Sequence, residues 1–138
     1  MSACKSEEQK ESEHEPIEGT WQLVDATTIQ NGMSSVTDFT KGKQMIKILN
    51  ATHFSFLQHD LNHGKDSLAV FTAGGGRYTL KGEVYTEHLE YCNSREWEDH
   101  TFSFNVIVRN DTLIQRGVEK IEEAGVDREI IERYVRVK

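Results

Sequence analysis

Apolar and polar residues alternate with a period of two along most of the chain after Ile17. The clearest run is 101–108 (TFSFNVIV), in which Phe102, Phe104, Val106 and Val108 fall on one face. Shorter alternating runs occupy 21–24, 44–48 and 53–56. Alternation of this kind is typical of strands with one face on a core, and these runs are rich in strand-favouring residues. The pattern therefore predicts an all-β domain.

A first turn signal, Lys81-Gly82, separates the alternating runs 77–80 and 83–87. A two-residue hairpin with glycine at the turn fits this spacing, because glycine accepts a positive φ. The hairpin predicts that Tyr78 pairs with Tyr85 and that Glu87 shares their face. Arg77, Thr79, His88 and Ser103 are then expected on opposite, solvent-facing sides, since unpaired Lys and Arg side chains are costly to bury.

A second turn signal, Asn110-Asp111, predicts that Val106 pairs with Gln115. The turns recur about every ten residues, and the runs between them predict eight or nine strands. A meander of this size normally closes on itself and so removes its unpaired edges. We therefore expect a single antiparallel up-and-down β-barrel. The stretch 33–40 (MSSVTDFT) breaks the pattern and is interpreted as a loop or one helical turn.

Length, composition and charge narrow the classes of function. The 138 residues suit one domain, which we place at 17–138 after a polar leader at 1–16. The formal net charge of -7 argues against nucleic acid as a partner. No apolar run approaches the roughly 18 residues of a transmembrane segment.

The N-terminal segment contains Cys4, preceded by small residues and followed by a charged stretch. Met1-Ser2-Ala3-Cys4 resembles the end of a bacterial lipobox, in which the cysteine carries a lipid. This similarity implies an extracytoplasmic bacterial lipoprotein that is anchored to the membrane through Cys4. The alternative is a cytoplasmic protein in which this cysteine occurs by chance. Cys4 and Cys92 are expected to be reduced thiols, because neither has a partner at metal-ligand spacing.

Several motifs resemble those of the lipocalins and the wider calycin group. Gly19-Thr20-Trp21 is similar to their Gly-x-Trp signature, and the stretches 52–56 (THFSF) and 74–87 (GGGRYTLKGEVYTE) resemble small bacterial lipocalin-like domains. The resemblance covers 17–138. It implies a barrel that is closed at one end by Trp21 with Arg136 packed across its ring, and a small-molecule ligand inside.

The predicted strand faces together define a candidate ligand-binding site. Its residues are aromatic or hydrogen-bonding: Phe54, Phe56, Gln58, Tyr78, Tyr85, Glu87, Phe104 and Gln115. A cavity with this lining suits an amphipathic molecule better than a plain fatty acid. It also suits a cavity that holds only ordered water. Glu87 is the residue expected to orient a polar group of the ligand.

Two further groups of residues, a histidine pair and a glycine triplet, are interpreted as structural rather than as metal-binding or phosphate-binding sites. His59 and His63 flank a turn, so we interpret them as exposed loop residues and predict no metal site. The glycine triplet 74–76 lacks the helix and lysine of a phosphate-binding loop, and glycines there allow a strand to bend. No cofactor and no catalytic residue are predicted.

Three functions are compatible with these observations. Non-catalytic binding of a small amphipathic or lipophilic molecule is favoured, because the inner faces are aromatic. The alternatives are a protein-interaction module that uses the barrel rim around 33–40, and, less favoured, an isomerase- or cyclase-type barrel enzyme.

Overall fold

The computed structural model describes residues 15–138, so the lipidation candidate Cys4 and most of the predicted leader lie outside the described residues. In this described part of the chain, nine strands and two short 3-10 helices follow one another. They are β1 (Gly19–Gln30), β2 (Met33–Asp38), β3 (Lys43–Leu49), β4 (His53–Asp60), β5 (Phe71–Lys81), β6 (Val84–Cys92), η1 (Arg95–Trp97), β7 (His100–Arg109), β8 (Thr112–Ile121), η2 (Glu122–Ala124) and β9 (Val126–Arg136).

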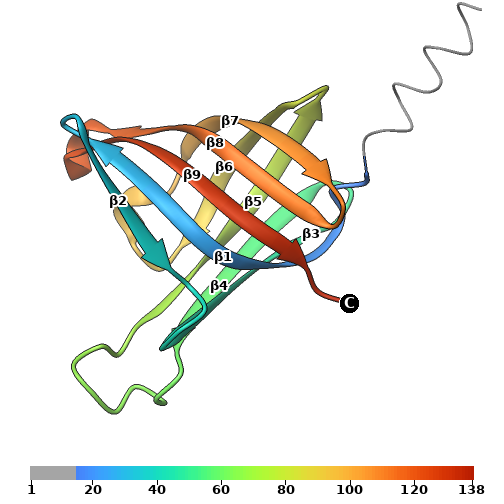
Figure 1. Ribbon diagram of the computed structural model, residues 1–138. Helices are drawn as coiled ribbons and strands as arrows, with labels where there is room; N and C mark the ends of the chain where they lie inside the picture. Colours follow the sequence, from blue (N-terminus) through green and yellow to red (C-terminus); the bar gives the residue numbers. More distant parts are fainter. Residues whose placement is uncertain (1–14) are drawn as a thin grey trace, which may run out of the picture.

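The strands form one antiparallel sheet that closes where β1 pairs with β9 (Figure 1). Eight strands make the closed barrel, and β2 is an additional strand that pairs with the second half of β1. The first half of β1 pairs instead with β3, so β2 and β3 share one edge of β1. The predicted all-β up-and-down barrel is therefore confirmed. It is compatible with a lipocalin-like fold.

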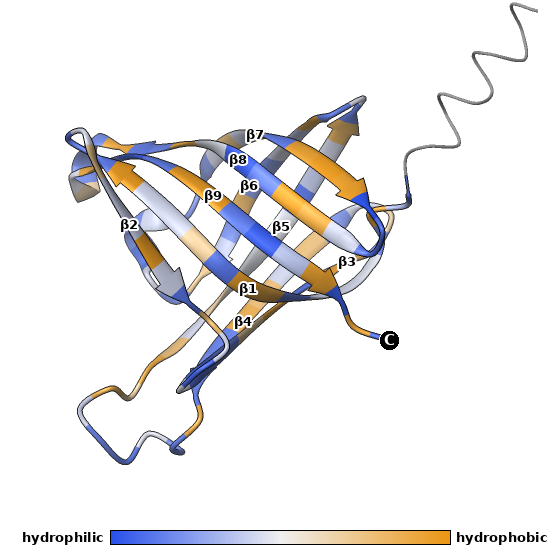
Figure 2. Cartoon of the chain, viewed as in Figure 1, coloured by the Kyte–Doolittle hydropathy of each residue, from blue (hydrophilic) through white to orange (hydrophobic). Residues whose placement is uncertain are grey.

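Hydrophobic and hydrophilic residues alternate along the strands, as Figure 2 shows. Strand β7 has the predicted arrangement, with Phe102, Phe104, Val106 and Val108 buried. The β7–β8 pairing places Val106 opposite Gln115, also as predicted. Asn110 and Asp111 both have positive φ, at 52° and 59°. Two such residues make the turn whose twist matches that of the flanking strands.

The predicted register of the β5–β6 hairpin is wrong. Lys81 pairs with Val84, so the turn is Gly82-Glu83, and Tyr78 lies opposite Glu87 rather than Tyr85. The register differs from the predicted one by two residues, and an even shift leaves every side chain on its predicted face. Arg77, Thr79 and Ser103 are accordingly exposed, while His88 is half-buried on the outer side.

The stretch 33–40 is also different from its interpretation as a loop or helical turn. Residues Met33–Asp38 are strand β2, paired with β1 through a turn at Asn31-Gly32. Both turn residues have positive φ, at 53° and 73°. Asn-Gly is the dipeptide that favours this turn most strongly, and it explains why a strand without an apolar face forms here.

One end of the barrel is closed by Trp21, which is fully buried. The guanidinium of Arg136 lies 4.2 Å from the Trp21 ring centroid. It donates to the carbonyl oxygens of Glu18 (2.8 Å) and Pro16 (2.7 Å). The backbone at Gly19 has a φ of 132°, and a Cβ there would lie 2.9 Å from the Arg136 Nη1. Glycine therefore makes room for the arginine beside the tryptophan.

The glycine triplet lies where β5 bends around the barrel. The β5–β6 register shifts between Gly75 and Gly76, which is a β-bulge. A Cβ on Gly75 would lie 2.5 Å from the carbonyl oxygen of Phe54, and one on Gly76 would collide with the carbonyl oxygen of His88. Neighbouring backbones can approach this closely only because the side chains are absent.

Candidate functional site

A cavity of about 380 Å³ lies inside the barrel, away from the Trp21 end of the core. Its apolar wall is formed by strands β1, β3, β4, β6 and β9, by η1, and by the segment that follows β2. These residues are Leu23, Ala26, Phe39, Met45, Phe56, Leu89, Cys92, Trp97 and Ile130. The polar part of the wall contains Thr28, Thr37, Lys47, Gln58, Thr72, Glu87, Ser94, Gln115, Glu119, Arg128, Glu132 and Tyr134.

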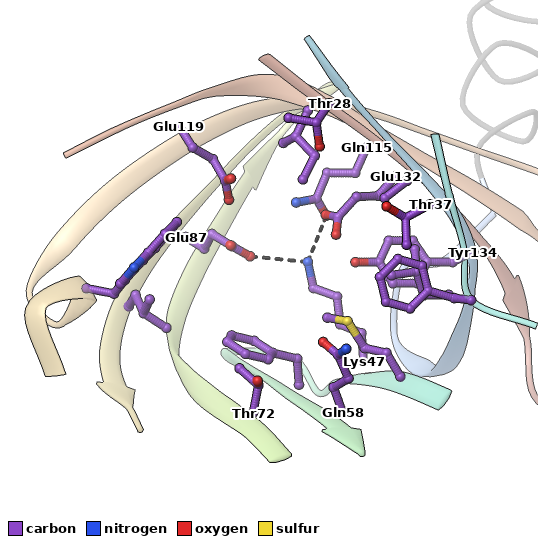
Figure 3. Close-up of a pocket in the computed structure, with 18 of the residues that line it drawn as sticks. Thr28, Thr37, Lys47, Gln58, Thr72, Glu87, Gln115, Glu119, Glu132 and Tyr134 are labelled. Carbon is purple, nitrogen blue, oxygen red and sulfur yellow. Dashed lines mark hydrogen bonds and ion pairs between the residues drawn. The ribbon is translucent and has the colours of Figure 1, made fainter. Parts of the chain in front are cut away.

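Lys47 carries the positive charge at the centre of this site. It lies on the inner face of β3, with a side chain only 5% exposed. Its Nζ donates to Gln115 Oε1 at 2.7 Å and to Glu87 Oε2 at 3.2 Å (Figure 3). The same Nζ lies 4.6 Å from the Tyr85 ring centroid. A buried ammonium is tolerated when it is paired and hydrogen-bonded in this way.

Glu87 is held from two sides. Besides the Lys47 contact, its Oε2 accepts a hydrogen bond of 2.8 Å from the Tyr85 hydroxyl. Burial, followed by the charge of Glu87, raises the pKa of Tyr85 well above its usual range. The phenol therefore stays protonated and remains a donor to the carboxylate.

A second ion pair joins neighbouring strands. Glu119 on β8 pairs directly with Arg128 on β9, and Arg128 Nε donates to Glu119 Oε1 at 2.8 Å. Arg128 also packs over the Trp97 ring, 5.5 Å from its centroid. Burial raises the pKa of the Glu119 carboxyl, and Arg128 opposes this increase.

Glu132 is the third carboxylate that borders the cavity. Its neighbours across the sheet are Ala26 on β1 and Gln115 on β8, neither of which is charged. Among residues 15–138, no basic group lies within ion-pair distance of it. Burial raises the pKa of Glu132 to about 7; Lys47 opposes this increase, and Glu119 and Glu87 add to it.

The structure brings together part of the predicted site. Phe56, Gln58, Glu87 and Gln115 line the cavity. The other four predicted residues lie in or beside the packed core. Phe54, Tyr85 and Phe104 are buried there, and the Tyr78 hydroxyl donates to the Asn50 carbonyl oxygen at 2.6 Å instead of joining Glu87. The ligand-binding role of all eight stays a prediction.

The expectation that lysine and arginine side chains face solvent is wrong for Lys47 and Arg128. Each is buried or half-buried beside a carboxylate partner, so the cost of desolvation is offset. The charged site residues that sequence reasoning missed are Lys47, Glu119, Arg128 and Glu132. Phe56 was predicted to face inward and is the cross-strand partner of Lys47, so a correct β3–β4 register would have identified Lys47.

His59 and His63 are both exposed, as predicted, but only His63 lies in a loop, because His59 belongs to strand β4 and pairs with Phe71. Between them, Asp60 is buried and accepts hydrogen bonds from the backbone N–H groups of Gly64 (2.9 Å) and Val70 (3.2 Å). This carboxylate holds the loop between β4 and β5 in place. The part of the chain that the structure describes contains no cluster of three or more His, Cys, Asp or Glu residues suited to a metal ion.

Two comparisons with known proteins complete the description. No protein-family model matches the chain, and no curated protein matches it either. Within residues 15–138 there is also no helix of the length and hydrophobicity that a membrane span requires.

Proposed function

We propose that this protein binds a small amphipathic molecule inside its barrel, in the manner of lipocalin-like proteins, without converting it. The observation that carries the proposal is the cavity of about 380 Å³, with an apolar wall and a hydrogen-bonded charged cluster at its polar side. Binding sites for small molecules typically combine such apolar walls with a few fixed polar groups. The apolar part of the ligand would contact residues such as Phe56 and Ile130, and its polar group would face Lys47, Glu87 and Glu132.

The polar groups favour an amphipathic ligand over a plain hydrocarbon. Filling the cavity with a fully apolar molecule would remove water from the exposed parts of Glu132 and Gln58 without replacing its hydrogen bonds. A lipid anchor at Cys4 and an extracytoplasmic location belong to the same proposal. They rest on the resemblance of residues 1–4 to a lipobox.

A cavity-filling variant tests the proposal. Gln58 lines the cavity from β4, so Gln58→Trp should occupy space that a ligand needs. Gln44 alternates onto the outer face of the neighbouring strand β3, so Gln44→Trp is the matched control. Prodan, a neutral dye whose fluorescence shifts in apolar surroundings, should bind the wild type and Gln44→Trp. Gln58→Trp should bind it at least about tenfold more weakly.

Native mass spectrometry of protein purified without detergent provides a second readout. A co-purified small molecule that is missing from Gln58→Trp would support binding in the cavity. Absence of dye binding to the folded wild type, or equal binding by both tryptophan variants, would contradict the proposal. Conversion of a bound molecule over time would replace the binding function by an enzymatic one.

A further inference from the structure

The acids and bases that border the cavity are unequal in number. Within residues 15–138, three carboxylates line it, from Glu87, Glu119 and Glu132, against two basic groups, from Lys47 and Arg128. Lys47 forms an ion pair with Glu87, and Arg128 forms one with Glu119. Glu132 is the acid left over. The interior therefore has room for one more positive charge.

The position of Glu132 makes it accessible to an occupant. It lies on the inner face of β9, between Ile130 and Tyr134, and all three side chains line the cavity. In Figure 3 its carboxylate points into the same space as those of Glu87 and Glu119.

From this arrangement we infer that the ligand carries a protonated amine, and that Glu132 is its counter-ion. This inference rests on the proposed function and specifies the chemical class of the ligand. An ammonium group beside Glu132 would balance the charges inside the barrel, and charge-assisted hydrogen bonds are the stronger class. An anionic ligand would add a fourth negative charge to the interior, and it would have to compete with Glu87 for Lys47.

The charges around Glu132 also predict how affinity depends on pH. The charged and titratable groups that line the cavity with it include Lys47 on β3, Glu87 on β6, Glu119 on β8, and Arg128 and Tyr134 on β9. Burial raises the pKa of Glu132 to about 7. An ammonium ligand binds the ionised form, so its affinity should rise as pH increases through this value. Between pH 5 and pH 8 the increase should be on the order of 10²-fold.

Three indole compounds with the same body and different end groups test the inference. Tryptamine carries an ammonium group, tryptophol a hydroxyl and indole-3-propionate a carboxylate. At pH 8 the full chain should bind tryptamine at least about tenfold more tightly than tryptophol, and indole-3-propionate most weakly. Between pH 5 and pH 8 the amine remains protonated, as lysine does, so a change in affinity reports on the protein.

Two glutamate variants on β9 serve as the test and its control. Glu132→Gln removes the charge with little change in shape, and it should abolish both the preference for tryptamine and its pH dependence. Glu129 pairs with Arg116 on the outer face, so Glu129→Gln should behave as the wild type. Circular dichroism and thermal unfolding confirm that both variants are folded before binding is measured.

The outcomes separate the two proposals. If prodan binds but tryptamine has no advantage, or if Glu132→Gln leaves that advantage unchanged, the ammonium inference is wrong and the binding function stands. If indole-3-propionate bound most tightly, the ammonium inference would also be wrong, and Lys47 would be the group that binds the charged end of the ligand. If neither prodan nor any indole compound binds the folded protein, both proposals fail together.

Discussion

Single residues determine the chemistry of this barrel, and Lys47 is the clearest case. Its ammonium group is nearly inaccessible to solvent and is held by Glu87 and Gln115. A buried pair of this kind contributes little relative to an apolar pair of equal shape, but removing one partner leaves the other charge uncompensated. The Lys47–Glu87 pair therefore restricts which single substitutions the interior tolerates.

A double-mutant cycle tests this pair. Lys47→Met should lower the free energy of unfolding by about 3–5 kcal/mol, because Glu87 is left buried without a cation. The double variant Lys47→Met with Glu87→Gln should recover a substantial part of that loss, as measured by urea denaturation. Additive losses in the double variant would show that the two side chains do not interact.

Arg136 makes a second prediction at this scale. Arg136→Ala should lower the free energy of unfolding by roughly 1–3 kcal/mol, because it removes the cation–π contact with Trp21 and the packing at the closed end. Arg133→Ala removes an exposed arginine from the same strand and should cost less than about 1 kcal/mol. Dye affinity should be unchanged in both variants. Unaltered stability of Arg136→Ala would exclude a closing role for this residue.

At the scale of strands and turns, the bulge between β5 and β6 sets how sharply the sheet curves. Gly76→Ala should destabilise the protein by more than about 2 kcal/mol, because the new methyl group meets the His88 carbonyl oxygen. Thr79→Ala, an exposed substitution on the same strand, should change stability by less than about 0.5 kcal/mol. Thermal unfolding of the two variants compares them directly. Equal midpoints would mean that the strands do not approach as closely as described.

Strand patterns predicted the elements better than they predicted the site. Alternation identifies which residues share a face, as in β7. It does not decide which face is buried, because the run 44–48 is equally compatible with Ile46 or Lys47 pointing inward. The side that faces inward depends on pairing with β4, where Lys47 lies opposite Phe56. Glu132 was missed because its place depends on the β8–β9 register, which is set by the longer hairpin loop 122–125 that contains η2 rather than by a two-residue turn.

For the whole molecule, the raised pKa of Glu132 connects pH to stability. Its folded-state value of about 7 lies above the ordinary glutamate value of 4.5, so the folded protein binds this proton more tightly than the unfolded chain. The resulting stabilisation is present at acid pH and is lost as pH rises from about 4.5 to 7. Relative to Glu132→Gln, the wild type should lose up to about 3 kcal/mol over that range.

Urea denaturation of both proteins at several pH values measures this difference. The comparison with Glu132→Gln removes the contributions of other groups, such as Asp60, whose pKa is lowered by backbone hydrogen bonds from Gly64 and Val70. Parallel stability curves for the two proteins would contradict the burial of an ionisable Glu132.

The central claim is that a ligand occupies the interior of the barrel, and methyl NMR of the folded protein tests it most directly. The probe is tryptamine at pH 8. We predict chemical-shift changes at the cavity-lining methyl groups of Ala26, Met45, Leu89 and Ile130. The methyl groups of the exposed residues Met33 and Leu68 should not respond. Changes confined to exposed residues, with the cavity methyl groups unaffected at saturation, would contradict the account.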